Sequence, residues 1–276
     1  MEKKNVNVAG GLNLSHRSYL KPPEKLDVRH CHEEYEILYV IEGSGKYIVE
    51  GVEYPVRPGT LMIFSPLEYH CLVMDPDAPY ERYVLFFFAN DLPEDIRELL
   101  ERRECENGIK SSFYSVDSVS PTLISIFERF ENSEILPGKE RESYAKLLVS
   151  EIVLLLSVAK REHITYNEIE LGARVIRYLN DHIDRDITLD KLAKKFFVSK
   201  YYLCRAFKKH NGISVHGYIN QKRVMYAKRL IESGETASGA AYKVGFGDYS
   251  AFYRAYVKVI GKAPTYQREG TEKNES

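Results

Sequence analysis

The sequence contains few cysteines and no long apolar run, and both absences restrict what the protein can be. Its longest apolar stretch, around residues 152–158, is far shorter than the roughly twenty residues that a helix needs to cross a bilayer. The first residues, MEKKNVNV, contain no apolar run of signal-peptide length. These features exclude a membrane-spanning protein. The cysteines show neither a paired metal-binding spacing nor a disulfide framework, so we expect a cytoplasmic protein without membrane contact; they are Cys31, Cys71, Cys105 and Cys204.

Charge is distributed unevenly along the chain, although the net charge is only −1. Residues 186–270 contain 16 Lys and Arg against 6 Asp and Glu, whereas residues 1–185 contain 22 against 32. Such an asymmetry is expected when only one part of a protein contacts phosphate groups. A length of 276 residues leaves room for two domains, each with its own core. We therefore predict an acidic N-terminal domain and a basic, nucleic-acid-binding C-terminal domain.

Two segments of the C-terminal part, residues 199–212 and 248–261, are similar to each other. Each begins with a residue that can cap a helix N-terminus, Ser199 or Asp248. Each ends with a glycine suited to the left-handed turn after a helix, and apolar residues between them recur at helical spacing. Repeats this short also occur in helical solenoids, but only two copies are present and a solenoid needs about three. The two segments are therefore predicted to be separate helices with the same role.

A short helical pattern precedes each repeat, and together they predict two helix-turn-helix units. Thr188 can cap the first of these short helices and Thr236 the second, which has the weaker pattern. Residues 214–233 join the units as a predicted helix of about twenty residues, which is about 30 Å long. Successive major-groove faces on one side of DNA lie about 34 Å apart. An all-α domain of this kind can place both recognition helices on one face of the duplex.

The outer faces of the repeats carry side chains suited to contact DNA. An arginine five or six residues into a short capped helix, such as Arg205 or Arg254, can hydrogen-bond to guanine or contact phosphate. Lys222, in the connecting helix, is also expected to contact phosphate. The predicted DNA-binding residues are Ser199, Lys200, Tyr201, Cys204, Arg205 and Lys208 in the first unit, and Asp248, Tyr249, Ser250 and Arg254 in the second.

The second repeat and its flanks contain a dense set of motif residues: Val244, Gly245, Phe246, Asp248, Phe252, Arg254, Lys258, Gly261, Pro264 and Arg268. With them, residues 171–270 resemble the double helix-turn-helix domain of the AraC/XylS family of bacterial transcription regulators. The chain departs from that pattern in the first helix of the second unit, where Ala237 and Ala240 replace larger apolar residues and Gly239 lies inside the helix. Smaller core side chains and an interior glycine both cost stability, so we expect the second unit to be the less stable one.

The N-terminal part is predicted to be mainly β. Aromatic and β-branched segments at residues 34–41, 45–50, 59–64, 71–74 and 81–88 are separated by glycines and prolines, which is typical of a small barrel or jelly roll. Helical patterns follow at 121–132 and 141–160. We expect a domain at 1–162 and a linker at 163–170. The last N-terminal helix either mediates a homodimer or covers its own barrel with a strongly apolar face, formed by Leu147, Leu148, Ile152, Leu155 and Leu156.

A group of histidines and one glutamate lies within the predicted barrel: His30, His32, Glu36 and His70. With Gly43 and Pro66 they resemble the two motifs of cupin domains, although Glu68 stands where the second motif has a glycine. Alternate residues of a strand share a face, so His30, His32 and Glu36 are expected to point together into the barrel. The set suits a metal with open positions, but the same side chains can instead hydrogen-bond a polar ligand. We expect the second case, with no metal or other cofactor.

The resemblance implies a transcription regulator rather than an enzyme. Its partners would be double-stranded DNA, RNA polymerase, a second copy of the chain and a small polar effector, such as a sugar, in the cupin-like domain. It would act as an activator, although the sequence does not distinguish activation from repression. Two alternatives remain: a metal-dependent cupin enzyme with an appended nucleic-acid module, and an architectural DNA-binding protein whose cupin-like domain serves only for dimerisation.

Overall fold

The computed structural model describes residues 2–7, 11–22, 29–103, 111–115, 120–160 and 171–264. The chain forms two compact units, Met1–Glu168 and Ile169–Ser276. The linker expected at 163–170 lies outside the described residues, as do Cys105 and Arg268. Within the described ranges, no helix is long and apolar enough to span a membrane.

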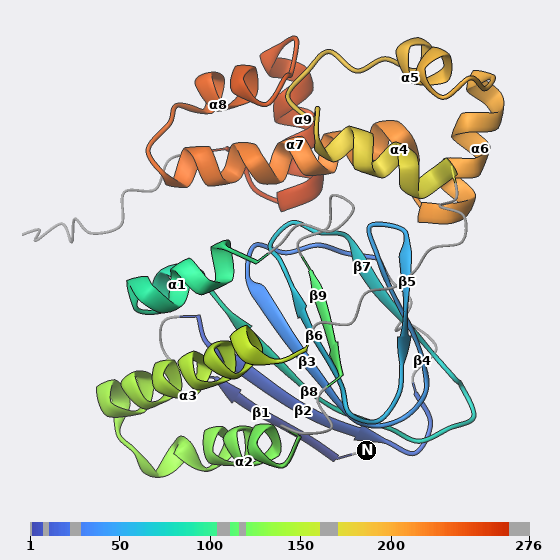
Figure 1. Cartoon of the computed structure of the whole chain (residues 1–276). Helices are drawn as coiled ribbons and strands as arrows, with labels where there is room; N and C mark the ends of the chain where they lie inside the picture. Colours follow the sequence, from blue (N-terminus) through green and yellow to red (C-terminus); the bar gives the residue numbers. More distant parts are fainter. Residues whose placement is uncertain are drawn as a thin grey trace, which may run out of the picture. The chain divides into compact units, whose positions relative to one another are not determined.

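The first unit is built from two antiparallel sheets that face each other (Figure 1). One sheet has six strands in the order β1-β2-β8-β3-β6-β9, and the other has three strands in the order β5-β4-β7. This is the mainly β, cupin-like fold that the sequence predicts. The strands are β1 (Glu2–Asn7), β2 (Asn13–Tyr19), β3 (Tyr35–Glu42), β4 (Gly45–Val49), β5 (Val52–Val56), β6 (Thr60–Phe64), β7 (His70–Met74), β8 (Tyr80–Phe87) and β9 (Ser112–Ser115).

Alternation along β3 separates the two cores of this unit. Leu38 and Val40 belong to the cluster between the sheets, whereas Ile37 and Tyr39 belong to the cluster that the helices cover. Since successive side chains of a strand point to opposite faces, a central strand buried on both sides must be apolar on both. Glu36 is the exception: it is buried on the inner side at 3 % exposure.

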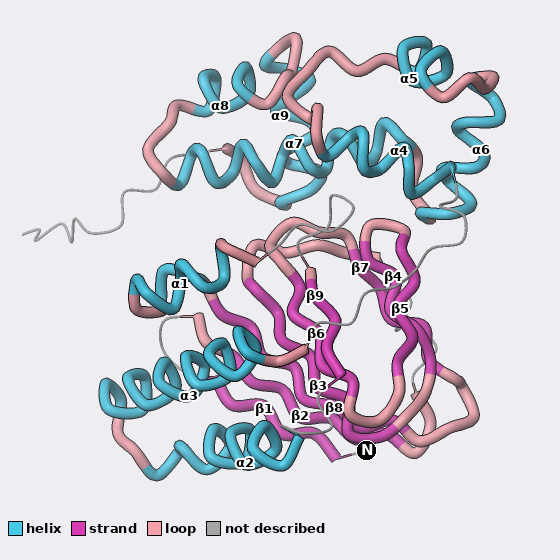
Figure 2. Tube along the Cα trace, in the orientation of Figure 1, coloured by secondary structure: helices cyan, strands magenta, loops and turns pink. Residues whose placement is uncertain are grey.

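Helices cover one face of the larger sheet (Figure 2). Only part of the predicted apolar face of the last N-terminal helix is buried. Leu148, Ile152 and Leu156 lie in the sheet–helix core, so the helix covers its own barrel. Leu147 is 65 % exposed and does not belong to that buried core. The helical elements are η1 (Ala89–Asp91), α1 (Glu94–Glu101), α2 (Ser120–Glu131), η2 (Asn132–Ile135) and α3 (Gly138–Val158).

The second unit is helical throughout its described part and contains the two predicted helix-turn-helix units joined by a long helix. The connecting helix is capped by Ser214, whose side chain accepts a hydrogen bond from the backbone of Gly217 at 3.1 Å. The first helix of this unit packs closely on the recognition helix, since a Cβ at Gly172 would lie 2.6 Å from His210. The helices are α4 (Leu171–Asn180), α5 (Leu189–Lys195), α6 (Lys200–Asn211), α7 (Val215–Glu232), α8 (Ala237–Lys243) and α9 (Tyr249–Ile260).

Candidate functional site

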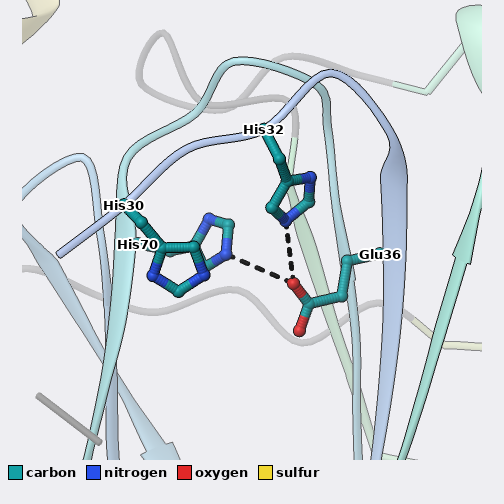
Figure 3. A group of neighbouring side chains, drawn as sticks. All are labelled: His30, His32, Glu36 and His70. Carbon is teal, nitrogen blue, oxygen red and sulfur yellow. Dashed lines mark hydrogen bonds and ion pairs between the residues drawn. The ribbon is translucent and has the colours of Figure 1, made fainter. Parts of the chain in front are cut away.

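The structure brings the four predicted effector residues of the first unit together (Figure 3). One ligand atom from each of His30, His32, Glu36 and His70 lies within 4.8 Å of the others. The backbone joins the segments: His30 N donates to His70 O at 3.0 Å, and His70 N donates to His30 O at 2.9 Å. The strand-parity argument for this group is wrong, because β3 begins only at Tyr35 and His30 and His32 precede it. Pairing with β7, rather than alternation along one strand, assembles the group.

Glu36 is the centre of the group. His32 Nε2 lies 2.9 Å from Glu36 Oε2, and His70 Nε2 lies 3.3 Å from the same oxygen. The other ring nitrogens face backbone carbonyls: His32 Nδ1 lies 3.0 Å from Glu34 O, and His70 Nδ1 lies 2.8 Å from Glu68 O. The His32 imidazole is therefore held at both ends, whereas the His70 imidazole is held through its Nδ1. Glu36 and His70 are buried, His32 is half-buried and His30 is exposed, so the group is accessible from the His30 side.

Glu36 and the imidazoles of this group shift one another's pKa. Burial alone would raise the pKa of the Glu36 carboxyl, but the imidazoles of His32 and His70 outweigh burial and hold that pKa below its usual range. Burial alone would lower the pKa of His32, but its hydrogen bond to Glu36 and the charge of that carboxylate raise it. Glu36 is thus ionised inside the protein, where an unpaired carboxylate would be strongly disfavoured.

Polar groups continue from Glu36 along the inner face of the larger sheet. Arg82 lies on β8 opposite Val40, on the same face as Glu36, and its guanidinium lies 5.5 Å from the ring centroid of Tyr80. Burial would lower the pKa of Arg82, but Tyr80, Tyr47 and Glu36 hold it above its usual value. Arg82 Nε and the Tyr80 hydroxyl are buried without a hydrogen-bond partner in the described structure. Sequence reasoning missed both residues, although they share the strand parity of Glu36 once the register is known.

The group has the chemistry of a binding site for a cation or a polar ligand. Three imidazoles and one carboxylate offer nitrogen and oxygen donors of the kind that bind zinc or iron. The same atoms can hydrogen-bond to hydroxyl or amine groups of a small molecule.

The recognition helices of the second unit begin and end as predicted. Ser199 Oγ accepts a hydrogen bond from the backbone N–H of Tyr202 at 3.2 Å, and Asp248 Oδ1 accepts one from Ala251 at 2.8 Å. Helix α6 ends at Gly212, with φ 71°, and α9 ends at Gly261, with φ 80°. The left-handed conformation at these two positions favours glycine over residues with a Cβ. Ser199 and Asp248 are therefore helix caps, whatever contact they make with DNA.

The predicted contact residues lie mostly on exposed faces of α6 and α9. Arg205, Lys208 and Arg254 are exposed, and the described residues give none of them an acidic partner. Lys200 is exposed but pairs with Asp190 at 2.9 Å. Of the remaining predicted residues, Cys204 is half-buried, and three are exposed: Tyr201, Tyr249 and Ser250.

Lys222 does not fit its predicted role as a phosphate contact. It is buried, at 3 % exposure, and its ammonium lies 5.5 Å from the ring centroid of Tyr218. The position is helical, but it lies on the inner side of α7, which the residue type alone does not reveal.

Arg223, which sequence reasoning missed, connects the two helix-turn-helix units. Its Nε donates to Ile183 O at 2.8 Å and its Nη2 donates to Arg185 O at 2.6 Å, both in the segment before α5. Its Nη1 donates to Gly245 O, in the turn before α9, at 2.7 Å. One guanidinium thus donates hydrogen bonds to backbone carbonyls that precede and follow the connecting helix in the chain.

Two family models match this chain. The AraC-like ligand binding domain matches residues 23–154, and a helix-turn-helix domain matches residues 192–270. The HTH-type transcriptional regulator YbfI of Bacillus subtilis is 25% identical over 240 residues, which cover 80% of this chain and 79% of YbfI. The HTH-type transcriptional activator RhaS of Salmonella arizonae is 25% identical over 265 residues, which cover 91% of this chain and 90% of RhaS.

Among solved structures, apo ToxT of Vibrio cholerae is similar over 91% of this chain and 95% of its own, with 14% identity and a TM-score of 0.38. The family models carry the assignment, because they fall on the β unit that holds the histidine group and on the unit that holds both recognition helices. The chain therefore belongs to the AraC family of DNA-binding transcription regulators, which are not enzymes, and combines an AraC-like ligand-binding domain with a C-terminal helix-turn-helix domain.

Proposed function

We propose that the protein regulates transcription in response to a small polar effector, a sugar or a related metabolite, that binds at the group of His30, His32, Glu36 and His70. The observation that carries the proposal is a buried carboxylate with two imidazole nitrogens at 2.9 and 3.3 Å, in an AraC-like ligand-binding domain. Polar groups that converge in an aromatic setting are typical of sites for small polar molecules. Phe64 and Phe86 supply that setting, with ring centroids 4.6 Å from His70 and 5.2 Å from His32, respectively.

DNA recognition is assigned to the exposed faces of α6 and α9. In the first helix-turn-helix unit, Tyr201, Cys204 and Arg205 read bases, and Lys200 and Lys208 contact phosphates. In the second helix-turn-helix unit, Tyr249, Ser250 and Arg254 read bases. The caps Ser199 and Asp248 set the start of α6 and of α9, respectively. The absence of acidic partners for Arg205 and Arg254 within the described structure supports this assignment, because neither guanidinium must break an ion pair to reach DNA.

A homodimer formed through α3 completes the proposal. Leu147, Leu154 and Val158 lie in one helical row, which also includes Glu151, and are 65 %, 49 % and 80 % exposed, on a side of α3 that does not pack on its sheet. Apolar residues exposed in a row are characteristic of contacts between proteins. A dimer would present two DNA-binding units to paired operator sites. RhaS is named an activator, and we assign activation through RNA polymerase to this protein too.

Coupling between the two sites requires that the effector binds one DNA-binding state better than the other, and such couplings are about 1–3 kcal/mol. The test is selection of DNA from a random pool by the full-length protein, with and without a panel of sugars and related metabolites. We expect one enriched motif, in which Arg254→Ala loses the preference at the bases that the second helix-turn-helix unit contacts. Enrichment of no motif, or a motif that no metabolite affects, would contradict the DNA-binding or the sensing part of the proposal, respectively.

A further inference from the structure

In the histidine group, the same ring nitrogen of two histidines points at one carboxylate oxygen. A backbone carbonyl can only accept, so the Nδ1 atoms of His32 and His70 must donate to Glu34 O and Glu68 O. The other ring nitrogens, both Nε2, approach Glu36 Oε2 at 2.9 and 3.3 Å.

His70 is buried at 1 % exposure, and its Nε2 has no hydrogen-bond partner in the described structure. A cation among the three atoms would give that nitrogen a partner and would balance the charge of Glu36.

We propose that His30, His32, Glu36 and His70 bind one divalent first-row transition metal ion. The four ligand atoms lie within 4.8 Å of one another. Ligands bind such ions at about 2.0–2.2 Å, so opposite ligands are about 4 Å apart, and the most distant pair of ligand atoms needs to approach by less than about 1 Å. A set of three nitrogens and one oxygen suits zinc, iron or manganese, whereas calcium and magnesium prefer oxygen ligands alone.

The surroundings of the group support this assignment independently. Histidines that bind metals generally donate their other ring N–H to a carbonyl or carboxylate, which fixes the ring and keeps the ligating nitrogen free of hydrogen. His32 and His70 both do so. The loop that supplies one of these carbonyls is itself anchored, since Glu68 accepts a hydrogen bond from the backbone N–H of Ser111 at 2.8 Å.

His30 is the exposed ligand, so any remaining coordination positions face that side of the site. The inference does not depend on the effector: the metal is bound with or without it. Under the proposed function, oxygen atoms of the effector would complete the coordination and bind these residues through the metal.

The test uses the full-length protein, freed of metal by a chelator and titrated with Co²⁺ and with Zn²⁺. We expect about one ion per chain, a visible Co²⁺ absorption band that Zn²⁺ abolishes, and at least about a 100-fold loss of affinity in Glu36→Gln. His30→Gln, at an exposed position where folding is not at risk, should weaken binding by about tenfold or more. His16→Gln is the matched control, because His16 bonds Glu131 and Glu81 at 3.0 and 2.8 Å in the same unit but outside the group, and it should bind as the parent does.

Parent protein without a Co²⁺ band, or His30→Gln with unchanged affinity, would overturn the metal site. A metabolite that still altered DNA binding by the metal-free protein would support the proposed function and overturn the expectation that the effector binds through the metal. Glu36→Gln is interpreted only if its circular dichroism and melting match those of the parent, and His30→Gln decides the matter otherwise.

Discussion

Arg205 and Lys208 lie on the same exposed face of α6, and replacing each with alanine should weaken DNA binding in different ways. A bidentate contact between an arginine and guanine is worth about 1–3 kcal/mol of discrimination. Since a tenfold change in affinity corresponds to about 1.4 kcal/mol, Arg205→Ala should bind its operator about 5- to 150-fold more weakly. Preference at one base pair should be relaxed at the same time. Lys208→Ala should weaken all sequences alike and reduce the slope of log affinity against log salt by about 0.9.

The structure explains why this loss should appear in DNA binding and not in folding. Arg205 and Lys208 are exposed and have no acidic partner within the described residues, so their removal breaks no native ion pair. Surface changes of this kind alter stability by no more than about 0.5 kcal/mol. Fluorescence anisotropy with operator DNA and with single-base variants, across a salt series, separates the two effects. Arg229→Ala, an exposed arginine near the end of α7, is the control.

An Arg205→Ala protein that bound its operator as tightly as the parent at matched salt would refute the assignment of α6 as a base-reading helix. Equal losses for Arg205→Ala on every sequence would instead make Arg205 a phosphate contact.

Other predictions concern stability and assembly. Asp248→Ala should cost about 1 kcal/mol in urea unfolding, because the cap on α9 is lost, whereas Asp248→Asn should cost little; equal costs would show that charge, and not capping, matters. Phe252→Ala removes a fully buried ring and should lower the free energy of unfolding by about 3–5 kcal/mol, so a melting curve like that of the parent would contradict the packing of the second helix-turn-helix unit. Leu154→Glu should convert the homodimer to a monomer in sedimentation at tens of micromolar, whereas Ile135→Glu, at an exposed position outside the α3 row, should not; a monomeric parent would end the dimer proposal.

The helical unit could be predicted closely because its signals are local. A cap such as Ser199, an apolar row and a left-handed glycine such as Gly212 lie within one short segment, and each fixes a helix end without help from distant residues. The connecting helix was predicted at 214–233 and is found at Val215–Glu232. Lys222 was misassigned because burial of one lysine on a long helix depends on what packs against it.

The sheets could be predicted only in part, because several strands depend on partners far away in the chain. Strand β2 is largely polar, but its His16 is satisfied by Glu81 and Glu131 and packs on Tyr83 at 4.1 Å between ring centroids. Strand β5 was not predicted; it contains Pro55 and lies at the edge of its sheet, where proline is tolerated. Helix α1 and strands β1 and β9 were also not predicted.

The histidine group was predicted from its residues and not from its geometry. The motif identified all four members, but the reason given for their meeting was alternation along a single strand. His30 instead reaches the group through its bridge to His70, and the direction of each ring depends on carbonyls that no sequence pattern marks. Arg82 and Tyr80 were missed for the same reason, since their position beside Glu36 follows from strand register.

The guanidinium of Arg223 has a consequence for the evolution of operators. It donates hydrogen bonds to carbonyls before the first helix-turn-helix unit and in the turn of the second, which opposes rotation of one unit relative to the other. One base pair inserted between the segments that the two helix-turn-helix units contact rotates these segments relative to each other by about 35°, since a turn of DNA contains about 10–10.5 base pairs. Under the proposed function, the spacing between the contacted segments would then be restricted as well as their bases.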